Sequence, residues 1–345
     1  MSAFKKSRKS FELQQKQLGI SPLFSLSEQE SQRAEDFIES LKGCNVFWHF
    51  DKQKHKQVID SLGGHRCECF VHRFGLMQKN GRPMPIHEYQ KPWYLALCND
   101  TDEETGYPII NVRKEGKRLL LHKPVGIGAS SWTAYLLIWL ATKDDALKNE
   151  EIALITGPNW DLAQSLLEDK YRKPFLRHNI ILPGSKSFTI IDGVLFKTYS
   201  TNLPALRGRE PKFLIVDEFD WFPPDSKKQV RETIERYTGS KNDSFILAMS
   251  TPASNQTESL MYQLEKEEPS IYQKISIDYT AANGTGMYTD SELLTARLSA
   301  AWRREYLAKW GGHTGNIFSS QSIDSAIEKG REFDLSYVDS MPWVS

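Results

Sequence analysis

The feature that most constrains the fold of this chain is an alternation of two patterns, a short apolar run and then a stretch with helical spacing. The apolar runs occupy residues 118–123, 151–156, 212–218 and 245–251, and residues 271–279 form a weaker fifth run. Strands buried on both faces of a sheet have such near-continuous apolar sequences, and helical crossovers make consecutive strands parallel. The alternation therefore predicts an α/β fold with a mainly parallel central sheet, covered by helices on both faces.

Helices and one hairpin are expected in the intervals between these strands. Residues 188–200 are predicted to form the hairpin, because Asp192-Gly193 is a dipeptide that favours a tight turn between two strands. The predicted helices cover residues 31–43, 130–142, 159–171, 226–237 and 257–268.

The composition is that of a globular protein. Of the 345 residues, 39% are apolar and 26% are charged, which excludes a wholly disordered chain and a multi-span membrane protein. The longest apolar stretch, residues 132–141, is too short to cross a bilayer. The formal net charge is zero, so any basic surface for nucleic acid has to be local. Four cysteines in so long a chain indicate a reducing compartment rather than a disulfide framework.

The segment LLLHKPVGIGASSW, residues 119–132, resembles a phosphate-binding loop that lacks its usual lysine. The usual pattern is Gly-x-x-x-x-Gly-Lys-[Ser/Thr], placed between a strand and a helix. Here the second glycine is Gly128 and the hydroxyl is that of Ser130, but Ala129 occupies the lysine position. These residues alone leave three interpretations open: a broken nucleotide site, a coincidence, or a site that takes its positive charge from elsewhere.

Two adjacent carboxylates, Asp217 and Glu218, follow the apolar residues 213–216. Groups at the carboxyl end of a buried parallel strand lie at the edge where open α/β sheets bind ligands. An enzyme that hydrolyses nucleotides needs one carboxylate for the magnesium shell and a second that polarises the attacking water. The alternative is a strand that ends in a solvated acidic turn.

Two hydroxyl residues, Ser250 and Thr251, end another apolar run just before Pro252. Hydroxyls at a strand end can sense a γ-phosphate or orient a water molecule, although an ordinary strand-to-loop transition would also explain them. The glycine-rich loop, the acidic strand and the Ser-Thr strand follow one another in the order of a P-loop NTPase core. Their combination favours that fold class, in its additional-strand, catalytic-glutamate form.

Longer segments provide a more specific resemblance. They cover roughly residues 89–318 and read HKPVGIGASS, ITGPNWDLAQSL, LRGREPKFLIVDEFDWF, LAMSTP and RREYLAKWGGHTGNIF. In these segments the chain resembles the ATPase domain of viral large terminase subunits, the motors that pump DNA into procapsids, and most of all the forms carried by archaeal viruses and proviruses. The letters LRG before the acidic strand, and the late GNIF, are more distinctive than the generic nucleotide motifs.

The resemblance suggests a source for the missing charge, because some terminases carry the loop lysine at the first position of the pattern. Lys123 occupies that position here, five residues before Gly128. The resemblance implies that Lys123 binds the phosphates together with the backbone of the loop and of the helix start. The implied phosphate-binding residues are Lys123, Gly126, Gly128, Ala129, Ser130 and Ser131. The chain departs from many terminases at Val125, where they carry an arginine.

The resemblance also assigns roles around the loop. Ser130 and Asp217 would hold magnesium, Glu218 would activate the attacking water, and Ser250 and Thr251 would couple hydrolysis to movement.

Tyr89 and Gln90 match loosely the family's adenine-recognition segment, and a packed amphipathic segment is the alternative. Arg207, which lies with Arg209 in LRGRE, is the candidate that would stabilise transition-state charge, while a salt bridge would explain this arginine equally well.

The stretch HRCECFVH raises the question of a metal site, because His65, Cys67, Cys69 and His72 are all potential zinc ligands. A single residue separates the two cysteines, however, which is closer than in the usual zinc knuckle. The Cys-x-Cys spacing also fits a strand with both cysteines on one face. We therefore interpret these cysteines as structural.

Three regions are expected along the chain. Residues 1–85 would form an N-terminal extension with helical and mixed segments, and residues 86–318 the P-loop ATPase domain. Residues 319–345 would be a linker toward a nuclease domain that this sequence does not contain.

The function implied by the resemblance is that of an ATPase, with ATP and Mg²⁺ as cofactors, which translocates double-stranded viral DNA. The implied partners are DNA, the viral portal protein and the small terminase subunit, with a homo-oligomeric ring on the portal and no membrane. The implied location is the cytoplasm of the host cell. Two alternatives are a nucleotide- or DNA-binding scaffold without hydrolysis, suggested by Ala129, and a helicase-type translocase, for which the sequence after Glu268 leaves no room for a second core.

Overall fold

The computed structural model describes most of the chain between residues 86 and 310, and several shorter pieces. The described residues are 28–42, 70, 74, 86–104, 106–143, 145–200, 206, 209–236, 243–253, 256, 258–310, 325–327 and 329. The expected extension and linker therefore lie largely outside the described residues, and the three-region division stays a prediction.

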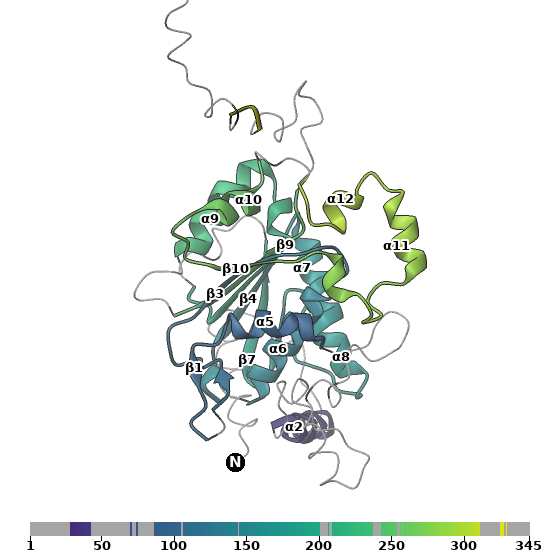
Figure 1. The fold of residues 1–345 in the computed structure, drawn as a ribbon. Helices are drawn as coiled ribbons and strands as arrows, with labels where there is room; N and C mark the ends of the chain where they lie inside the picture. The colour runs from purple at the N-terminus through teal and green to yellow at the C-terminus, as the bar shows by residue number, and fades with distance from the viewer. Residues whose placement is uncertain are drawn as a thin grey trace, which may run out of the picture.

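A β-sheet forms the centre of the protein (Figure 1). It has eight strands, in the order β10-β3-β9-β8-β4-β7-β6-β5. The strands from β10 to β7 are parallel to their neighbours, and β6 and β5 extend the sheet antiparallel at one end. The bounds are β3 Arg118–His122, β4 Glu151–Thr156, β5 Gly184–Ser185, β6 Phe188–Ile191, β7 Val194–Tyr199, β8 Phe213–Asp217, β9 Phe245–Ser250 and β10 Gln273–Ser276. A separate pair, β1 (Asp100–Thr101) and β2 (Pro108–Ile109), is antiparallel.

The strand order confirms the predicted fold class. β9 lies between β3, which leads into the glycine-rich loop, and β8, which ends in the acidic pair. This inserted strand is the additional strand of the predicted P-loop class. The register places Asp217 beside Met249 and His122 beside Ser250, so the polar ends of three strands meet at one edge of the sheet.

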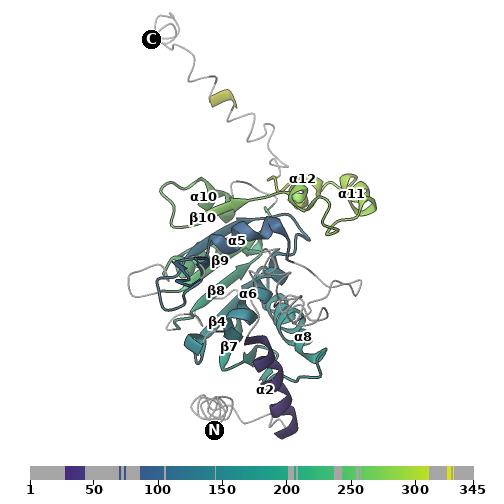
Figure 2. The same cartoon turned by 60° about the horizontal axis from the view of Figure 1, so that its bottom comes forward.

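Successive residues of each central strand point to opposite faces, and each face is covered by helices (Figure 2). Leu119, Leu121 and Ile215 belong to the core that also contains helix α6, Ala129–Lys143. Leu120 and Leu214 belong to the core on the other face, with helices α9 (Pro224–Arg236) and α10 (Leu260–Lys266). The near-continuous apolar runs of the sequence follow from this burial on both sides.

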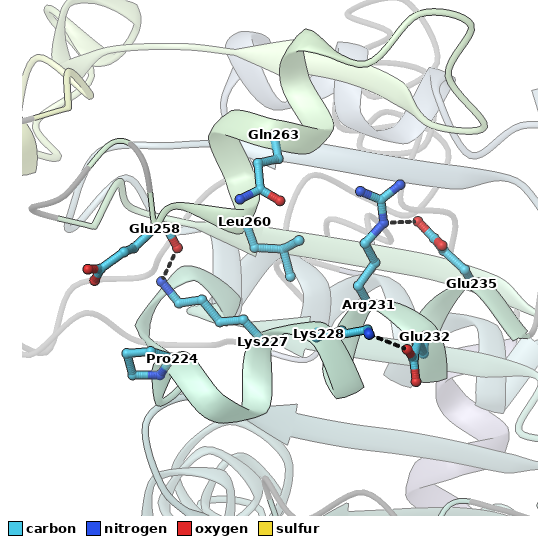
Figure 3. A pocket seen from close by; sticks show the side chains of 9 residues that line it. All are labelled: Pro224, Lys227, Lys228, Arg231, Glu232, Glu235, Glu258, Leu260 and Gln263. Atoms are coloured by element: carbon cyan, nitrogen blue, oxygen red, sulfur yellow. Dashed lines mark hydrogen bonds and ion pairs between the residues drawn. The ribbon is translucent and has the colours of Figure 1, made fainter. Parts of the chain in front are cut away.

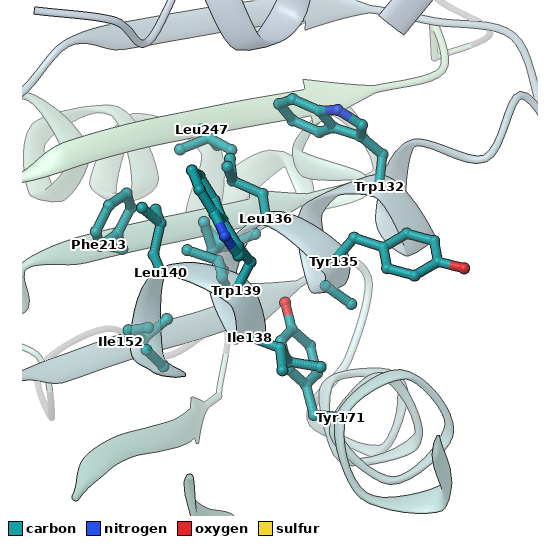
Figure 4. Packing of buried hydrophobic residues seen from close by; sticks show 14 of the residues in the cluster. Trp132, Tyr135, Leu136, Ile138, Trp139, Leu140, Ile152, Tyr171, Phe213 and Leu247 are labelled. Carbon is teal, nitrogen blue, oxygen red and sulfur yellow. The ribbon is translucent and has the colours of Figure 1, made fainter. Parts of the chain in front are cut away.

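Helix α6 is the most deeply buried helix of the described chain (Figure 4). All of its residues from Ser131 to Thr142 are buried. Trp139 and Leu140 pack among Ile152 of β4 and Phe213 of β8 (Figure 4). The other helices of this face are α2 (Glu28–Lys42), α5 (Lys91–Leu95) and α8 (Lys173–Leu176).

The predicted single helix over residues 159–171 is wrong in its form. The chain instead makes α7 (Trp160–Leu166), a π-helix (Leu167–Arg172) and α8 without a break. Asn159 is the N-cap of α7, and its side chain accepts a hydrogen bond from Leu162 N. The wider π turn follows from packing against α6 and the sheet, which periodicity within the segment does not show.

Several short elements complete the described chain. They are the 3-10 helices Glu88–Gln90, Asp145–Leu147, Phe219–Trp221 and Tyr279–Ala282, and the helices α11 (Asp290–Arg297) and α12 (Trp302–Glu305). Among the described residues, no helix has the length and apolar character needed to cross a membrane.

Candidate nucleotide site

The glycine-rich loop joins β3 to α6 and leaves a helix start without a side-chain cap. Gly126 and Gly128 have φ angles of 73° and 83°, a left-handed conformation that glycine adopts without steric cost. The carbonyl of Gly128 accepts the first intrahelical hydrogen bond, from Trp132 N at 2.9 Å. Because Gly128 has no side chain, it cannot cap the first N–H groups of α6, which have no partner within the helix. The geometry is that of an anion-binding turn.

The acidic pair stands opposite the loop at the end of β8. Asp217 is the last residue of the strand and is 4% exposed. Glu218 follows with φ 49° and ψ 39°, a left-handed conformation that is uncommon for residues other than glycine. Strained backbone of this kind is concentrated at functional sites.

Close contacts join the loop to the acidic pair. The Ser130 hydroxyl donates to Asp217 Oδ2 at 2.5 Å. The buried ammonium of Lys123 lies 2.5 Å from Glu218 Oε1 and 3.7 Å from Asp217 Oδ1. A cation from the first position of the pattern therefore lies within reach of the hydroxyl and the carboxylates that a phosphate site requires.

The end of β9 completes the cluster. Glu218 Oε2 accepts hydrogen bonds from Thr251 N at 3.1 Å, Thr251 Oγ1 at 3.0 Å and Ser250 Oγ at 3.3 Å. Trp221 Nε1 donates to Thr251 Oγ1 at 2.8 Å. The backbone carbonyl of Ser250 also accepts a hydrogen bond from the backbone N–H of Lys123 at 3.0 Å.

The electrostatics of the cluster differ between the two carboxylates. Burial raises the pKa of Asp217, as does the neighbouring charge of Glu218, and Lys123 and Ser130 only partly oppose this rise. Burial also acts to raise the pKa of Glu218, but the charge and hydrogen bond of Lys123 and the hydrogen bonds of Thr251 outweigh it and lower that pKa. Burial acts to lower the pKa of Lys123, and the charges of Asp217 and Glu218 reverse this effect and raise it. The lysine and the glutamate thus form the ion pair.

Two tyrosines fix the loop from outside. The Tyr89 hydroxyl donates to the Ile127 carbonyl at 2.9 Å, and the Tyr288 hydroxyl donates to the Val125 carbonyl at 2.5 Å. Val125 N donates in turn to the carbonyl of Glu305 at 2.7 Å. The segment from residue 279 to residue 306 therefore lies against the loop, although nothing in its sequence marked it for this position.

Gln90 is buried, and its side-chain oxygen accepts a hydrogen bond from His87 N at 2.9 Å, as part of a capping box. The structure thus gives Gln90 a local role in its own turn. Its role toward adenine, like that of Tyr89, stays a prediction.

Some predicted groups lie outside the described residues. These are Arg207 and the segment that contains His65, Cys67, Cys69 and His72. Arg209 is described, and its backbone N–H donates to the Leu206 carbonyl at 3.0 Å. Within the described parts of the chain, no group of His, Cys, Asp and Glu side chains is arranged as a metal cluster.

Sequence reasoning missed Asp220 and Lys170. Asp220 is buried and accepts hydrogen bonds from Ala253 N at 2.7 Å and Ser259 Oγ at 2.7 Å, so it ties the end of β8 to the segment after β9. The letters DEFD contain this carboxylate, but they do not reveal its burial. The Lys170 ammonium donates to the Ser131 hydroxyl at 2.8 Å.

A polar hollow also lies between α9 and α10, on the opposite face from α6 (Figure 3). The cations that line it have partners: Arg231 contacts Glu235 and Glu267 at 2.7 Å each, and Lys227 donates to the backbone carbonyl of Glu258 at 2.7 Å. None of the predicted nucleotide-site residues lines it.

The strand order and the glycine-rich loop define a domain of the P-loop fold class. Residues 120–325 match the family described as terminase large subunit, T4likevirus-type, N-terminal. This match covers more than half of the chain, and the chain belongs to that family. The family model describes the N-terminal part of terminase large subunits. A comparison with the sequences of curated proteins gives no significant match.

Solved structures of terminases are similar to this chain. The large terminase of bacteriophage HK97 is 16% identical, with a TM-score of 0.50 over 70% of this chain and 54% of that chain. The large terminase ATPase domain of Thermus phage P74-26 is 15% identical, with a TM-score of 0.40 over 59% of this chain and 95% of that one. The large terminase of another thermophilic bacteriophage, in complex with ATP-gamma-S, is 10% identical, with a TM-score of 0.44 over 66% and 53%. The chain thus spans about half the length of the HK97 protein.

Proposed function

We propose that this domain hydrolyses ATP at the cluster of Lys123, Ser130, Asp217 and Glu218, and that hydrolysis drives the movement of double-stranded DNA. The observation that carries the proposal is the contact of Lys123 with Glu218 and Asp217 beside the uncapped start of α6. The position of this ammonium makes up for Ala129, the residue at which the usual lysine is missing.

The residues also fit magnesium. Ser130 Oγ and Asp217 Oδ2 lie 2.5 Å apart, and hydroxyl and carboxylate oxygens are the ligands that Mg²⁺ takes beside a nucleotide. These two residues would hold the ion, which when bound offsets negative charge on the phosphates.

Nucleotide binding would rearrange the ion pair. The N–H groups from Gly126 to Ser131 would bind phosphate oxygens, and the triphosphate would compete with Glu218 for the Lys123 ammonium. Glu218, still held by Thr251, would then accept a proton from a water molecule as that water attacks the γ-phosphorus. The new P–O bond forms as the bond to the ADP leaving group breaks. The hydrogen bonds of Thr251, which also act to lower the pKa of Glu218, would remain and favour the ionised form that a base requires.

Ser250 and Thr251 are suited to pass this change to the rest of the domain. They contact Glu218 through their side chains, and the Ser250 carbonyl accepts from the backbone of Lys123. Protonation of Glu218 would weaken these hydrogen bonds, because its carboxylate loses the negative charge that strengthens them. We therefore assign them the coupling role.

The wider assembly follows the family. The proposed partners are DNA, the portal protein and the small terminase subunit, with a ring of subunits on the portal in the cytoplasm of the host cell. Arg207 is the proposed source of positive charge on the transition state.

The test compares the wild-type protein with Glu218→Gln, which keeps the shape of the side chain and removes the base. We expect Glu218→Gln to bind ATP and to lose DNA-stimulated phosphate release by roughly 10²–10⁴-fold. Glu268→Gln is the matched control, because Glu268 is exposed and pairs with Lys274. If the wild-type protein binds ATP but releases no more phosphate than Glu218→Gln, the chain is a nucleotide-binding scaffold and the proposal is wrong.

A further inference from the structure

Lys170 brings a second positive charge to the start of α6. Its ammonium donates a hydrogen bond to Ser131 Oγ at 2.8 Å, across a sequence separation of 39 residues. Ser131 is buried and is the third residue of α6, so its backbone N–H is one of those without an acceptor inside the helix. A cation is thus placed beside N–H groups that are oriented to bind an anion.

The π-helix explains how Lys170 reaches this place. Leu167–Arg172 is wound more loosely than an α-helix, and such π turns are frequent at functional sites. Tyr171, the next residue, is buried in the core beside α6, and burial, together with the charge of Asp217, raises the pKa of its hydroxyl. The π-helix therefore presents two consecutive residues toward the loop and the acidic strand.

The net charge of the cluster explains why a second cation would assist phosphate binding. Lys123 already faces both Asp217 and Glu218, so these three groups together carry a net negative charge when ionised. A polyphosphate that enters the loop would meet this negative charge, and a further cation beside the bound Mg²⁺ would help to offset it. The contact of Lys170 with Ser131 is to a hydroxyl oxygen, and a phosphate oxygen at the same helix start can accept a hydrogen bond from the same ammonium.

Ser130 and Ser131 divide the helix start between two neighbours. Ser130 points to Asp217, on the side where Lys123 and Glu218 lie, and Ser131 points to Lys170. A cation at Ser131 is therefore placed for a phosphate group other than the one next to Glu218. Such a group is present in both ATP and ADP.

We propose that Lys170 is a second phosphate-binding cation of this site, which contacts the part of the polyphosphate that ATP and ADP share. The inference rests on the proposed function, because it takes the loop to be the nucleotide site. It assigns different ligand dependence to the two lysines: Lys170 contributes to the affinity for both nucleotides, whereas Lys123 discriminates ATP from ADP.

The experiment measures the dissociation constants of magnesium-ADP and of a magnesium complex of a non-hydrolysable ATP analogue by calorimetry. Lys170→Gln keeps a hydrogen-bond donor for Ser131 and removes the charge, and Lys170→Arg keeps the charge. Lys173→Met is the matched control, because Lys173 is a half-exposed cation of the same segment that pairs with Asp169 at 2.5 Å. Thermal unfolding establishes that each variant is folded.

We expect Lys170→Gln to weaken both nucleotides by about tenfold to a hundredfold, the range for loss of a charge-assisted hydrogen bond. Lys170→Arg should retain most of the affinity, and Lys173→Met should bind as the wild type does. Raising the salt concentration should weaken binding less in Lys170→Gln than in the wild type, which a merely structural tie to Ser131 would not produce.

The outcomes separate this inference from the proposed function. Wild-type affinity for both nucleotides in Lys170→Gln overturns the role of Lys170 and leaves the nucleotide site intact. A loss confined to the ATP analogue also overturns it, because that result places the lysine at the γ-phosphate. A wild-type protein that binds neither nucleotide overturns both proposals.

Discussion

Helices α6 and α7 each follow a parallel strand of the same sheet, but their first turns are built differently. α7 is capped by its own Asn159, whose side chain accepts a hydrogen bond from Leu162 N at 3.1 Å. α6 is preceded by Gly128, which offers no side chain, and its first turn carries Ser130 and Ser131 instead. One helix start is closed by its own sequence, and the other is open to an external anion.

After their first turns, the two helices differ in burial, and here α6 is the more enclosed of the two. α6 is apolar all round and buried between the sheet and the surrounding helices, while α7 leaves Trp160 and Leu162 exposed. The open end of α6 is thus attached to the most rigidly packed helix of the domain. This arrangement suits a binding site, because groups on a buried helix keep their positions when ligands come and go.

The largest effect is expected when the cation opposite the open end is removed. Lys123→Ala should lower ATP hydrolysis by roughly a thousandfold, comparable to the loss of a fixed charge-stabilising group in an active site. It should also destabilise the protein by about 3–5 kcal/mol, because Asp217 and Glu218 remain buried without their counter-charge. Phosphate release and urea denaturation measure the two losses separately.

A second substitution tests whether position or charge is decisive. Lys123→Ala combined with Ala129→Lys moves the lysine to the usual place in the pattern, and we expect it to recover hydrolysis at least tenfold over Lys123→Ala, the equivalent of about 1.4 kcal/mol. Lys123→Gln, which keeps the size of the side chain, should stay as inactive as Lys123→Ala. Wild-type turnover in Lys123→Ala would show that the open end of α6 does not depend on this lysine.

The parts of the fold that depend on local chemistry could be predicted from the sequence. β4 has the bounds Glu151–Thr156 that its apolar run predicts, and the hairpin turns at Asp192-Gly193, where both φ angles are positive. The meeting of Ser130 with Asp217 could also be anticipated, because β8 ends at Asp217 on the same edge of the parallel sheet at which β3 leads into the loop before Ser130.

The rest depends on contacts between segments that are distant in the sequence. The π-helix buries Tyr171 against distant segments, and the hydrogen bond between Lys170 and Ser131 joins residues 39 positions apart, so neither has a signal in the local sequence. The approach of Tyr288 to Val125 likewise depends on how the chain returns after β10. The predicted helix over residues 257–268 is shorter, at Leu260–Lys266, because Ser259 is its N-cap and its side chain accepts from Tyr262 N.

A moderate effect is expected in the buried body of α6. Leu140 is 2% exposed and packs in the core beside Ile152 and Phe213, so Leu140→Ala should lower the free energy of unfolding by about 3 kcal/mol, the sum of lost apolar burial and of a cavity. Leu298→Ala is the control, because Leu298 is 89% exposed, and it should change stability by less than about 0.5 kcal/mol. A Leu140→Ala protein as stable as the wild type would contradict the view of α6 as the rigid support of the site.

The smallest effect is expected at the closed end of α7. Asn159→Ala removes the acceptor of the Leu162 N–H and should cost about 1 kcal/mol of stability in chemical denaturation. Asn159→Asp retains the acceptor and adds a negative charge at the helix start, which favours it, so this variant should be at least as stable as the wild type. Because α7 continues into the π-helix that carries Lys170, Asn159→Ala also tests how independent the two helix starts are. If Asn159→Ala destabilises only the start of α7, nucleotide affinity is unchanged. If nucleotide affinity falls as far as in Lys170→Gln, the cap of α7 helps to position Lys170 at the open end of α6.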